Sequence, residues 1–346
     1  MKTRLWTVDK NNVDNICCPQ LEEAAKLLQQ HEVVAFPTET VYGLGADATS
    51  DEAVDKIFKA KGRPSDNPLI VHIGDVKQVD SIASHIPIKA AKVIDAFWPG
   101  PLTVILPKKD YVSVKVTAGL DTVAVRMPSH PVALALLKKV SLPIAAPSAN
   151  LSGKPSPTHG QHVMKDLEGR ISGIVDGGAT GVGVESTVLD CTEDIPVILR
   201  PGGVTKSQLE AVIGEVKIDQ ALLDNNQAPK SPGMKYTHYA PDAPLIIVQG
   251  TEDFLQQQIL KYQNEGKKVG VLTTVENKGV YQADAVIVCG ERSSLETVAS
   301  ELYSTLRSFN EYEVDVILSE SFPEDGVGQA IMNRLVKAAG HQFIIQ

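Results

Sequence analysis

The residues of this 346-residue chain that could do chemistry are cations and hydroxyls in loops rich in Gly and Pro. The cations are Lys61, Arg63, Arg126 and Arg200. The hydroxyls belong to Thr38, Thr40, Ser148, Ser156 and Ser186, and the Gly-rich stretch 177–183 adds backbone N–H groups. Charge-assisted hydrogen bonds and backbone N–H groups of this kind bind phosphate and carboxylate oxygens. The set therefore predicts a site where the four cations converge on one anion.

Each of these residues also has a purely structural explanation. Lys61 and Arg63 stand at the end of an expected helix, where cations complement the helix dipole. His72 lies in an apolar strand pattern and is equally consistent with a hydrogen-bonded core residue. Ser148 and Asn150 are common turn residues. The number of such loops, rather than any one of them, favours a ligand site.

Common catalytic signatures are absent from the sequence. It contains no G-x-x-x-x-G-K-[ST], G-x-G-x-x-G, H-E-x-x-H or G-x-S-x-G pattern, so a P-loop NTPase, a dinucleotide enzyme and a common hydrolase are not indicated. The four cysteines, Cys17, Cys18, Cys191 and Cys289, form no C-x-x-C pair and have no His at zinc spacing. We expect reduced structural thiols and no protein-held metal.

The segment 231-SPGMKYTHYAP-241 is unusual for a linker. Its Pro and Gly residues predict exposed, non-helical chain. Tyr236, His238 and Tyr239 would suit packing against a flat, charged ligand, whereas an ordinary spacer is rich in Ser, Gly, Glu or Gln. The alternative is a loop that packs on its own domain.

The elements that must position these residues follow an alternating pattern. Strands are expected at 33–36, 69–73, 102–106 and 123–127, with a further strand in 143–150 that runs into a loop. Thr49 and Glu52 match a capping box for a helix over 50–62 closed by Gly62, and a second box starts a helix at Thr205. The stretches 37–45 and 177–187 are expected to be loops. In an open α/β sheet such loops gather at the carboxyl ends of the strands, where ligands bind.

The chain is long enough for two domains. We expect a catalytic domain over 1–218, a linker or lid over 219–244, and a smaller α/β domain over 245–346, in which strands alternating with helices predict a parallel, doubly wound sheet. The last of these holds 8 Lys and Arg against 14 Asp and Glu, within a formal net charge of -9. An anionic ligand therefore belongs to the first part. No apolar run has the length of a membrane span and no signal peptide is evident, so a cytoplasmic location is expected.

Several motifs together resemble a known family. They are PTETVYGLG, the KGR of 61–63 with the SAN of 148–150, SPT, STV, RPG and SPGMKYTHYAP. The combination is similar to the L-threonylcarbamoyladenylate synthase family in its long YrdC/Sua5 form. The resemblance implies a YrdC-like twisted open sheet with helices, followed by a Rossmann-like parallel α/β domain. It also implies that L-threonine, bicarbonate and ATP give threonylcarbamoyl-AMP and pyrophosphate, for the t6A modification next to tRNA anticodons.

The resemblance also implies roles for single residues. Lys61 and Arg63 would neutralise phosphates as the catalytic pair. Threonine would be held by Thr40, His72, Arg126, Ala146 and Ser186. The nucleotide would be held by Arg63, Asn67, Thr122, Ser148, Asn150, Ser156 and Arg200, with Tyr236, His238 and Tyr239 as a lid.

The implied cofactor is Mg²⁺, carried by ATP because no carboxylate cluster offers to bind it. The implied partners are the substrates and a downstream threonylcarbamoyl transferase complex that modifies tRNA, with weak contact to tRNA itself and none to a membrane. The sequence leaves two alternative functions open. One is a carbamoyl-adenylate-forming domain, although the acylphosphatase and Cys-rich segments expected of such proteins are missing. The other is a double-stranded RNA-binding module.

Overall fold

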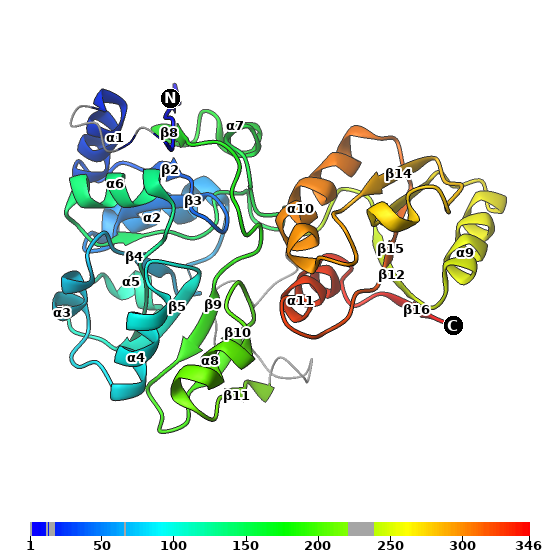
Figure 1. Ribbon diagram of the computed structural model, residues 1–346. Coiled ribbons are helices and arrows are strands. Elements are labelled where there is room, and N and C mark those ends of the chain that lie inside the picture. The colour runs from blue at the N-terminus through cyan, green and yellow to red at the C-terminus, as the bar shows by residue number, and fades with distance from the viewer. Residues whose placement is uncertain (1, 12, 14–17, 66, 221–238) are drawn as a thin grey trace. The chain divides into compact units, whose positions relative to one another are not determined.

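The computed structural model describes residues 2–11, 13, 18–65, 67–220 and 239–346 (Figure 1). The chain folds into two compact units. The first unit comprises residues 1–152, 157–181 and 185–235, and the second comprises 153–156, 182–184 and 236–346. The expected linker over 219–244 falls largely outside the described residues. Ser156, a predicted site residue, is grouped with the second unit.

A mixed sheet of 11 described strands forms the first unit, in the order β1-β8-β2-β3-β7-β4-β6-β5-β9-β10-β11. The strands are β1 (Arg4–Thr7), β2 (Val34–Phe36), β3 (Gly43–Asp47), β4 (Ile70–His72), β5 (Leu102–Pro107), β6 (Thr122–Arg126), β7 (Ile144–Ala145), β8 (Gly173–Asp176), β9 (Thr187–Asp190), β10 (Val197–Arg200) and β11 (Lys217–Ile218). Strands β2 and β8 are parallel, as are β4 and β6, whereas β3 runs antiparallel to both of its neighbours. The twisted open sheet expected for this part is confirmed.

Helices cover both faces of this sheet (Figure 1). They are α1 (Pro19–Gln29), α2 (Asp51–Lys61), η1 (Val76–Gln78), α3 (Val79–Ile82), α4 (Ile88–Phe97), α5 (Val114–Thr117), α6 (Pro131–Val140), α7 (Gly160–Leu167) and α8 (Lys206–Ile213). The apolar stripes of α1 and α6 pack in one cluster with Val34 and Phe36 of β2. Those of α2, α4 and α8 pack in another that includes Ala35 of the same strand. Successive residues of a strand point to opposite faces, so the core lies in two layers.

Two helix ends test the capping predictions. The box that starts α8 is confirmed, because the Thr205 side chain accepts from Gln208 N and the Gln208 side chain accepts from Thr205 N. The box at Thr49 is wrong by one residue: Ser50 is the N-cap of α2 and accepts from Ala53 N. Thr49 instead donates its hydroxyl to Asp47. Gly62 ends α2 with a φ of 63°, as expected.

The stretch 37–45 was expected to be a loop throughout, and this is wrong in its second half. Residues Gly43–Asp47 form β3, paired with β2 on one side and β7 on the other. A Cβ at Gly45 would lie 2.7 Å from the Phe36 ring and 2.9 Å from Ile144, so only glycine lets the strands approach this closely. The strand expected in 143–150 is correspondingly short, at Ile144–Ala145. Strands β1 and β11 had not been expected at all.

The second unit contains a five-stranded parallel sheet in the order β14-β13-β15-β12-β16. Its elements are β12 (Leu245–Gln249), α9 (Glu252–Asn264), β13 (Val269–Thr273), η3 (Val275–Asn277), β14 (Ala285–Val288), α10 (Leu295–Ser308), η4 (Phe309–Glu311), β15 (Val316–Glu320), α11 (Gly328–Ala338) and β16 (Phe343–Ile345). The parallel, doubly wound arrangement is confirmed, and β16 is an additional strand. Among the described residues, no helix combines the length and the apolar character needed to cross a bilayer.

Candidate active site

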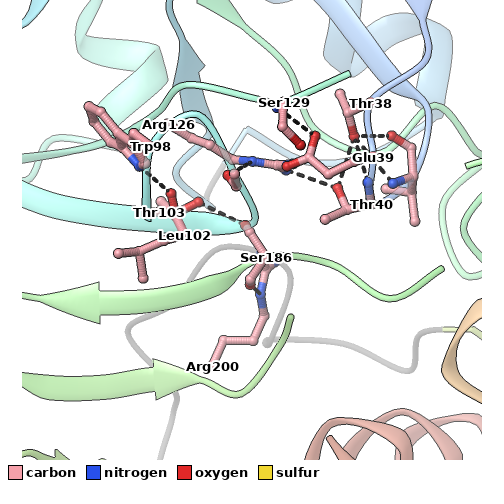
Figure 2. A network of polar contacts seen from close by, with 12 residues as sticks. Thr38, Glu39, Thr40, Trp98, Leu102, Thr103, Arg126, Ser129, Ser186 and Arg200 are labelled. Carbon is pink, nitrogen blue, oxygen red and sulfur yellow. Dashed lines mark hydrogen bonds and ion pairs between the residues drawn. The ribbon is translucent and has the colours of Figure 1, made fainter. Parts of the chain in front are cut away.

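Arg126 is the centre of a buried polar network in the first unit (Figure 2). It is the last residue of β6 and is 3% exposed. Its Nη1 donates to the Thr40 hydroxyl at 2.9 Å, its Nε donates to Gly100 O at 3.3 Å, and its Nη2 lies 2.6 Å from Glu39 Oε1. Thr40 is also bonded to Thr38, whose hydroxyl donates to Val41 O. Thr40 and Arg126, both predicted to bind threonine, are therefore in direct contact.

His72 lies beside this network because β4 and β6 are in register. Their pairing places His72 opposite Arg126, and Ala146 follows β7 on the other side of β4 and donates its N–H to Ile70 O. Burial, assisted by the charge of Arg126, lowers the pKa of His72 to about 3. The imidazole is therefore neutral at physiological pH. Its Nδ1 lies 3.2 Å from Ile70 O and donates to it, which leaves Nε2 as the acceptor nitrogen.

Ser186 and Arg200 form a second group in the same unit. Arg200 donates from Nε and Nη2 to Ser186 O, at 3.1 and 2.9 Å, and from Nη2 to the Ser186 hydroxyl at 3.1 Å. The Ser186 hydroxyl is also 2.8 Å from Thr103 Oγ1 on β5. Figure 2 shows this group below Arg126, with Thr103 between the two. Ser186, predicted to bind threonine, and Arg200, predicted to bind the nucleotide, are therefore in direct contact.

Lys61 forms a third group with the loop that follows β7. It ends α2 and is buried, and its Nζ donates to Ser148 O at 2.5 Å and to Asn150 O at 2.7 Å. The Ser148 hydroxyl donates to Asn150 Oδ1 at 2.6 Å. The KGR and SAN motifs are therefore held together. The structure thus links the predicted residues in three groups, rather than by direct contact of all four cations at one point.

The remaining predicted residues are spread more widely. Asn67 is buried and Arg63 half-buried, just after α2. Thr122 begins β6, at the opposite end of that strand from Arg126. Tyr239 is buried and packs on Tyr303 within the second unit, with ring centroids 5.0 Å apart. The residues Tyr236 and His238 lie outside the described part of the chain, as does most of the lid.

Two residues of the network were missed by sequence reasoning. Glu39 stands between Thr38 and Thr40, so the motif that supplied two predicted hydroxyls also contained the carboxylate that pairs with Arg126. Thr103 is a buried hydroxyl in an otherwise apolar strand, LTVILP. A polar residue in an apolar strand was the signal used for His72, and the same signal applies to Thr103.

The described residues offer no metal cage, and the thiols of Cys191 and Cys289 are not activated. No group of three His, Cys, Asp or Glu side chains that could hold a metal ion occurs among them. Burial raises the pKa of Cys191 and of Cys289 to about 12, so both thiols stay protonated near neutral pH. The described side chains of the network are cations, hydroxyls, a neutral imidazole and the carboxylate of Glu39.

A separate cavity of about 500 Å³ lies at the amino ends of β2 and β8. It is lined by Glu32, Val33, Lys56, Lys59, Ala60 and residues 169–172. Thr38, Glu39 and Thr40 follow the carboxyl end of β2, so this cavity is not the polar network. We place the site at the network, because buried converging charges indicate ligand chemistry more directly than volume does.

Comparison with known proteins identifies the family. A family model described as "Telomere recombination" matches residues 26–202, and one described as "Threonylcarbamoyl-AMP synthase, C-terminal domain" matches residues 204–340. The threonylcarbamoyl-AMP synthase of Bacillus subtilis is 61% identical over 345 residues, covering 99% of this chain and 100% of that protein. The chain belongs to the threonylcarbamoyl-AMP synthase family.

Other members of the threonylcarbamoyl-AMP synthase family agree with this assignment. The protein of that name from Pyrococcus abyssi is 50% identical over 326 residues, covering 93% of this chain and 94% of that protein. The crystal structure of P. abyssi Sua5 complexed with L-threonine matches with a TM-score of 0.92 and 48% identity, covering 99% of this chain and 100% of that one. The two-part α/β fold expected from the motifs is therefore the fold of the family.

Proposed function

We propose that this protein makes threonylcarbamoyl-AMP, pyrophosphate and water from L-threonine, bicarbonate and ATP. The main supporting observation is the buried group of Arg126, Thr40 and neutral His72, which offers a guanidinium for a carboxylate beside uncharged partners for a hydroxyl. Family membership supports the same conclusion. The reaction joins a carbamate oxygen to the α-phosphate while pyrophosphate leaves. Such a transfer needs alignment and charge neutralisation more than a covalent nucleophile.

In this proposal Arg126 binds the threonine carboxylate and His72 Nε2 accepts a hydrogen bond from the threonine hydroxyl. Thr40 orients Arg126 through its 2.9 Å contact and, with Ser186 and the Ala146 backbone, completes the pocket. Guanidinium groups suit this role because their planar set of donors matches a carboxylate.

The nucleotide is assigned to the other two groups. Lys61 and Arg63 neutralise phosphates, and Arg200 contributes a further cation. The other proposed contacts are Asn67, Thr122, Ser148, Asn150 and Ser156. The lid of Tyr236, His238 and Tyr239 stays a prediction, in which aromatic side chains exclude water from the adenylate.

Mg²⁺ is proposed to enter with ATP, because the described residues provide no acidic cluster to hold it. The product is proposed to pass in the cytoplasm to the threonylcarbamoyl transferase complex that modifies tRNA, with at most weak contact between this protein and tRNA. The other readings of the sequence, RNA binding alone and carbamoyl-adenylate formation, gain no support from the comparisons that define the family.

The proposed function is tested by measuring pyrophosphate release with threonine and bicarbonate each omitted in turn. We expect release only when ATP and both other substrates are present. Release that continues without threonine would point to carbamoyl-adenylate formation instead. Salt-dependent RNA binding without ATP turnover would favour the RNA-binding alternative.

The pocket also predicts a ranking of amino-acid substrates. Serine keeps the hydroxyl of threonine and lacks its methyl group, whereas valine keeps the size and lacks the hydroxyl. An unpaired buried polar group costs more than a missing methyl group, so we expect kcat/KM for serine to exceed that for valine by about tenfold or more. The measurement is pyrophosphate release with each amino acid. Equal values would reject His72, Thr40 and Ser186 as the hydroxyl-binding group.

A further inference from the structure

Glu39 and Arg126 form an ion pair in which the two facing atoms are not hydrogen-bonded to each other. Glu39 Oε1 and Arg126 Nη2 are 2.6 Å apart, with side chains 12% and 4% exposed. Yet among the described residues neither of these buried atoms has a hydrogen-bond partner of acceptable geometry, the other member of the pair included. The two charges are close, but the N–H bonds of Nη2 do not point at Oε1. Buried polar atoms in this state are rare, because leaving them unpaired costs free energy.

The rest of both side chains is firmly held. Arg126 donates from Nε to Gly100 O and from Nη1 to Thr40. The second oxygen of Glu39 accepts from Ser129 N at 3.1 Å, and Ser129 belongs to the loop that follows β6 (Figure 2). One positive and one negative group are thus fixed side by side by separate partners. Fixing them in advance lowers the entropy cost of binding a ligand between or across them.

A ligand that satisfies both atoms must offer an acceptor to Arg126 and a donor to Glu39, and the opposite charges of the pair favour a negative group beside a positive one. The α-carboxylate and α-ammonium of an amino acid meet this condition because both are attached to one carbon. A nucleotide phosphate or bicarbonate does not, because it carries no positive group and its negative charge would be repelled by Glu39. The pair is therefore complementary to a zwitterion rather than to an anion.

We propose that Glu39 binds the α-ammonium group of the amino-acid substrate while Arg126 binds its α-carboxylate. This inference rests on the proposed function, which requires an amino acid at this site, and extends it by a residue that touches the reacting nitrogen. The carboxylate of Glu39 selects for an unacylated α-ammonium group and holds the nitrogen that, once it has lost a proton, becomes the carbamate. N-acylated amino acids and hydroxy acids bind more weakly for lack of a cation.

The simpler alternative is that Glu39 only orients Arg126. The two roles differ in their dependence on the ligand's amine. If Glu39 acts through Arg126, removing Glu39 weakens the binding of every ligand that carries the carboxylate. If Glu39 binds the ammonium group, removing Glu39 weakens the binding only of ligands that carry an ammonium group. L-threonine and 3-hydroxybutyrate, which is threonine without the amine, separate these cases.

The experiment is a calorimetric titration of both ligands into the full-length protein and its Glu39→Gln variant. For L-threonine we expect Kd to rise about tenfold or more, the scale of one lost charge-assisted hydrogen bond. For 3-hydroxybutyrate, weak already in the unmodified protein, Kd should change less than about threefold. Glu22→Gln is the matched control, since Glu22 is also ion-paired, with Lys139, on an exposed surface. It should change neither value.

An equal loss for both ligands would overturn the proposal in favour of an orienting role. So would equal affinity of the unmodified protein for threonine and 3-hydroxybutyrate, a comparison that needs no variant. If Glu39→Gln does not fold, as judged by circular dichroism, Glu39→Asp keeps the charge and serves for the same comparison. Failure of the unmodified protein to bind threonine at all would instead count against the proposed function.

Discussion

Replacing Lys61 with Ala is expected to lower the rate of pyrophosphate formation by at least about 100-fold, the scale of losing one preorganised charge donor. Lys61 is buried at the end of α2, and its Nζ holds the carbonyl oxygens of Ser148 and Asn150. The substitution removes the charge proposed to neutralise phosphates and also releases the loop proposed to bind the nucleotide. The measurement is the steady-state rate of pyrophosphate release with saturating substrates.

The control for this experiment is Lys59→Ala, on the same helix. Lys59 is exposed, and it lines the separate cavity rather than the polar network. Its replacement should leave the rate within about twofold of the original. Threonine binding by Lys61→Ala, which depends on the Arg126 group, checks that the variant has folded. Near-normal turnover in a folded Lys61→Ala protein would indicate that Lys61 only complements the dipole at the end of the helix.

Replacing Arg126 with Lys is expected to raise KM for threonine about 100-fold while KM for ATP stays nearly constant. A lysine keeps the positive charge beside Glu39, so the buried carboxylate is not left without a cation. It cannot reproduce the guanidinium donors that reach Gly100 O, Thr40 and the ligand carboxylate at once. The measurement is pyrophosphate release with threonine and ATP varied separately.

Arg170→Lys is a suitable control because Arg170 is exposed and lies in the loop before β8. It should leave both KM values unchanged. An unchanged KM for threonine in Arg126→Lys would contradict the assignment of the carboxylate site. Equal increases in both KM values would indicate that the whole site, rather than the threonine pocket, had been disturbed.

Local sequence rules predicted most helices and the core strands. The helix α8 begins where the Thr205 box places it, because this signal acts within one turn of chain. Strand β3 was missed because GLGAD has two glycines, which local propensity counts against a strand. What makes it a strand is close packing on Phe36 and Ile144, one of them far along the sequence.

For the candidate site as well, the sequence predicted single residues but not the contacts between residues distant in the chain. The motifs named Thr40, Arg126, Ser186 and Arg200, and the structure joins these residues into two contacting pairs. The contact from Arg126 to Thr40 spans 86 residues of sequence. Its neighbour Glu39 was missed, because the role of a carboxylate in a loop can be recognised only when the fold brings a cation close to it. Local sequence patterns therefore do not predict the contacts of the site that form between strands distant in the sequence.

The pairing of β1 with β8 determines when during synthesis the first strand can join its sheet. Arg4–Thr7 of β1 lies in register with Gly173–Asp176, so this first strand has no partner until the chain has been made as far as Asp176. At 5–20 residues per second, that takes roughly ten to thirty-five seconds. During this interval the backbone N–H and C=O groups of the nascent strand are open to pairing with other chains. Chaperone protection of the amino terminus would therefore matter most before β8 is synthesised.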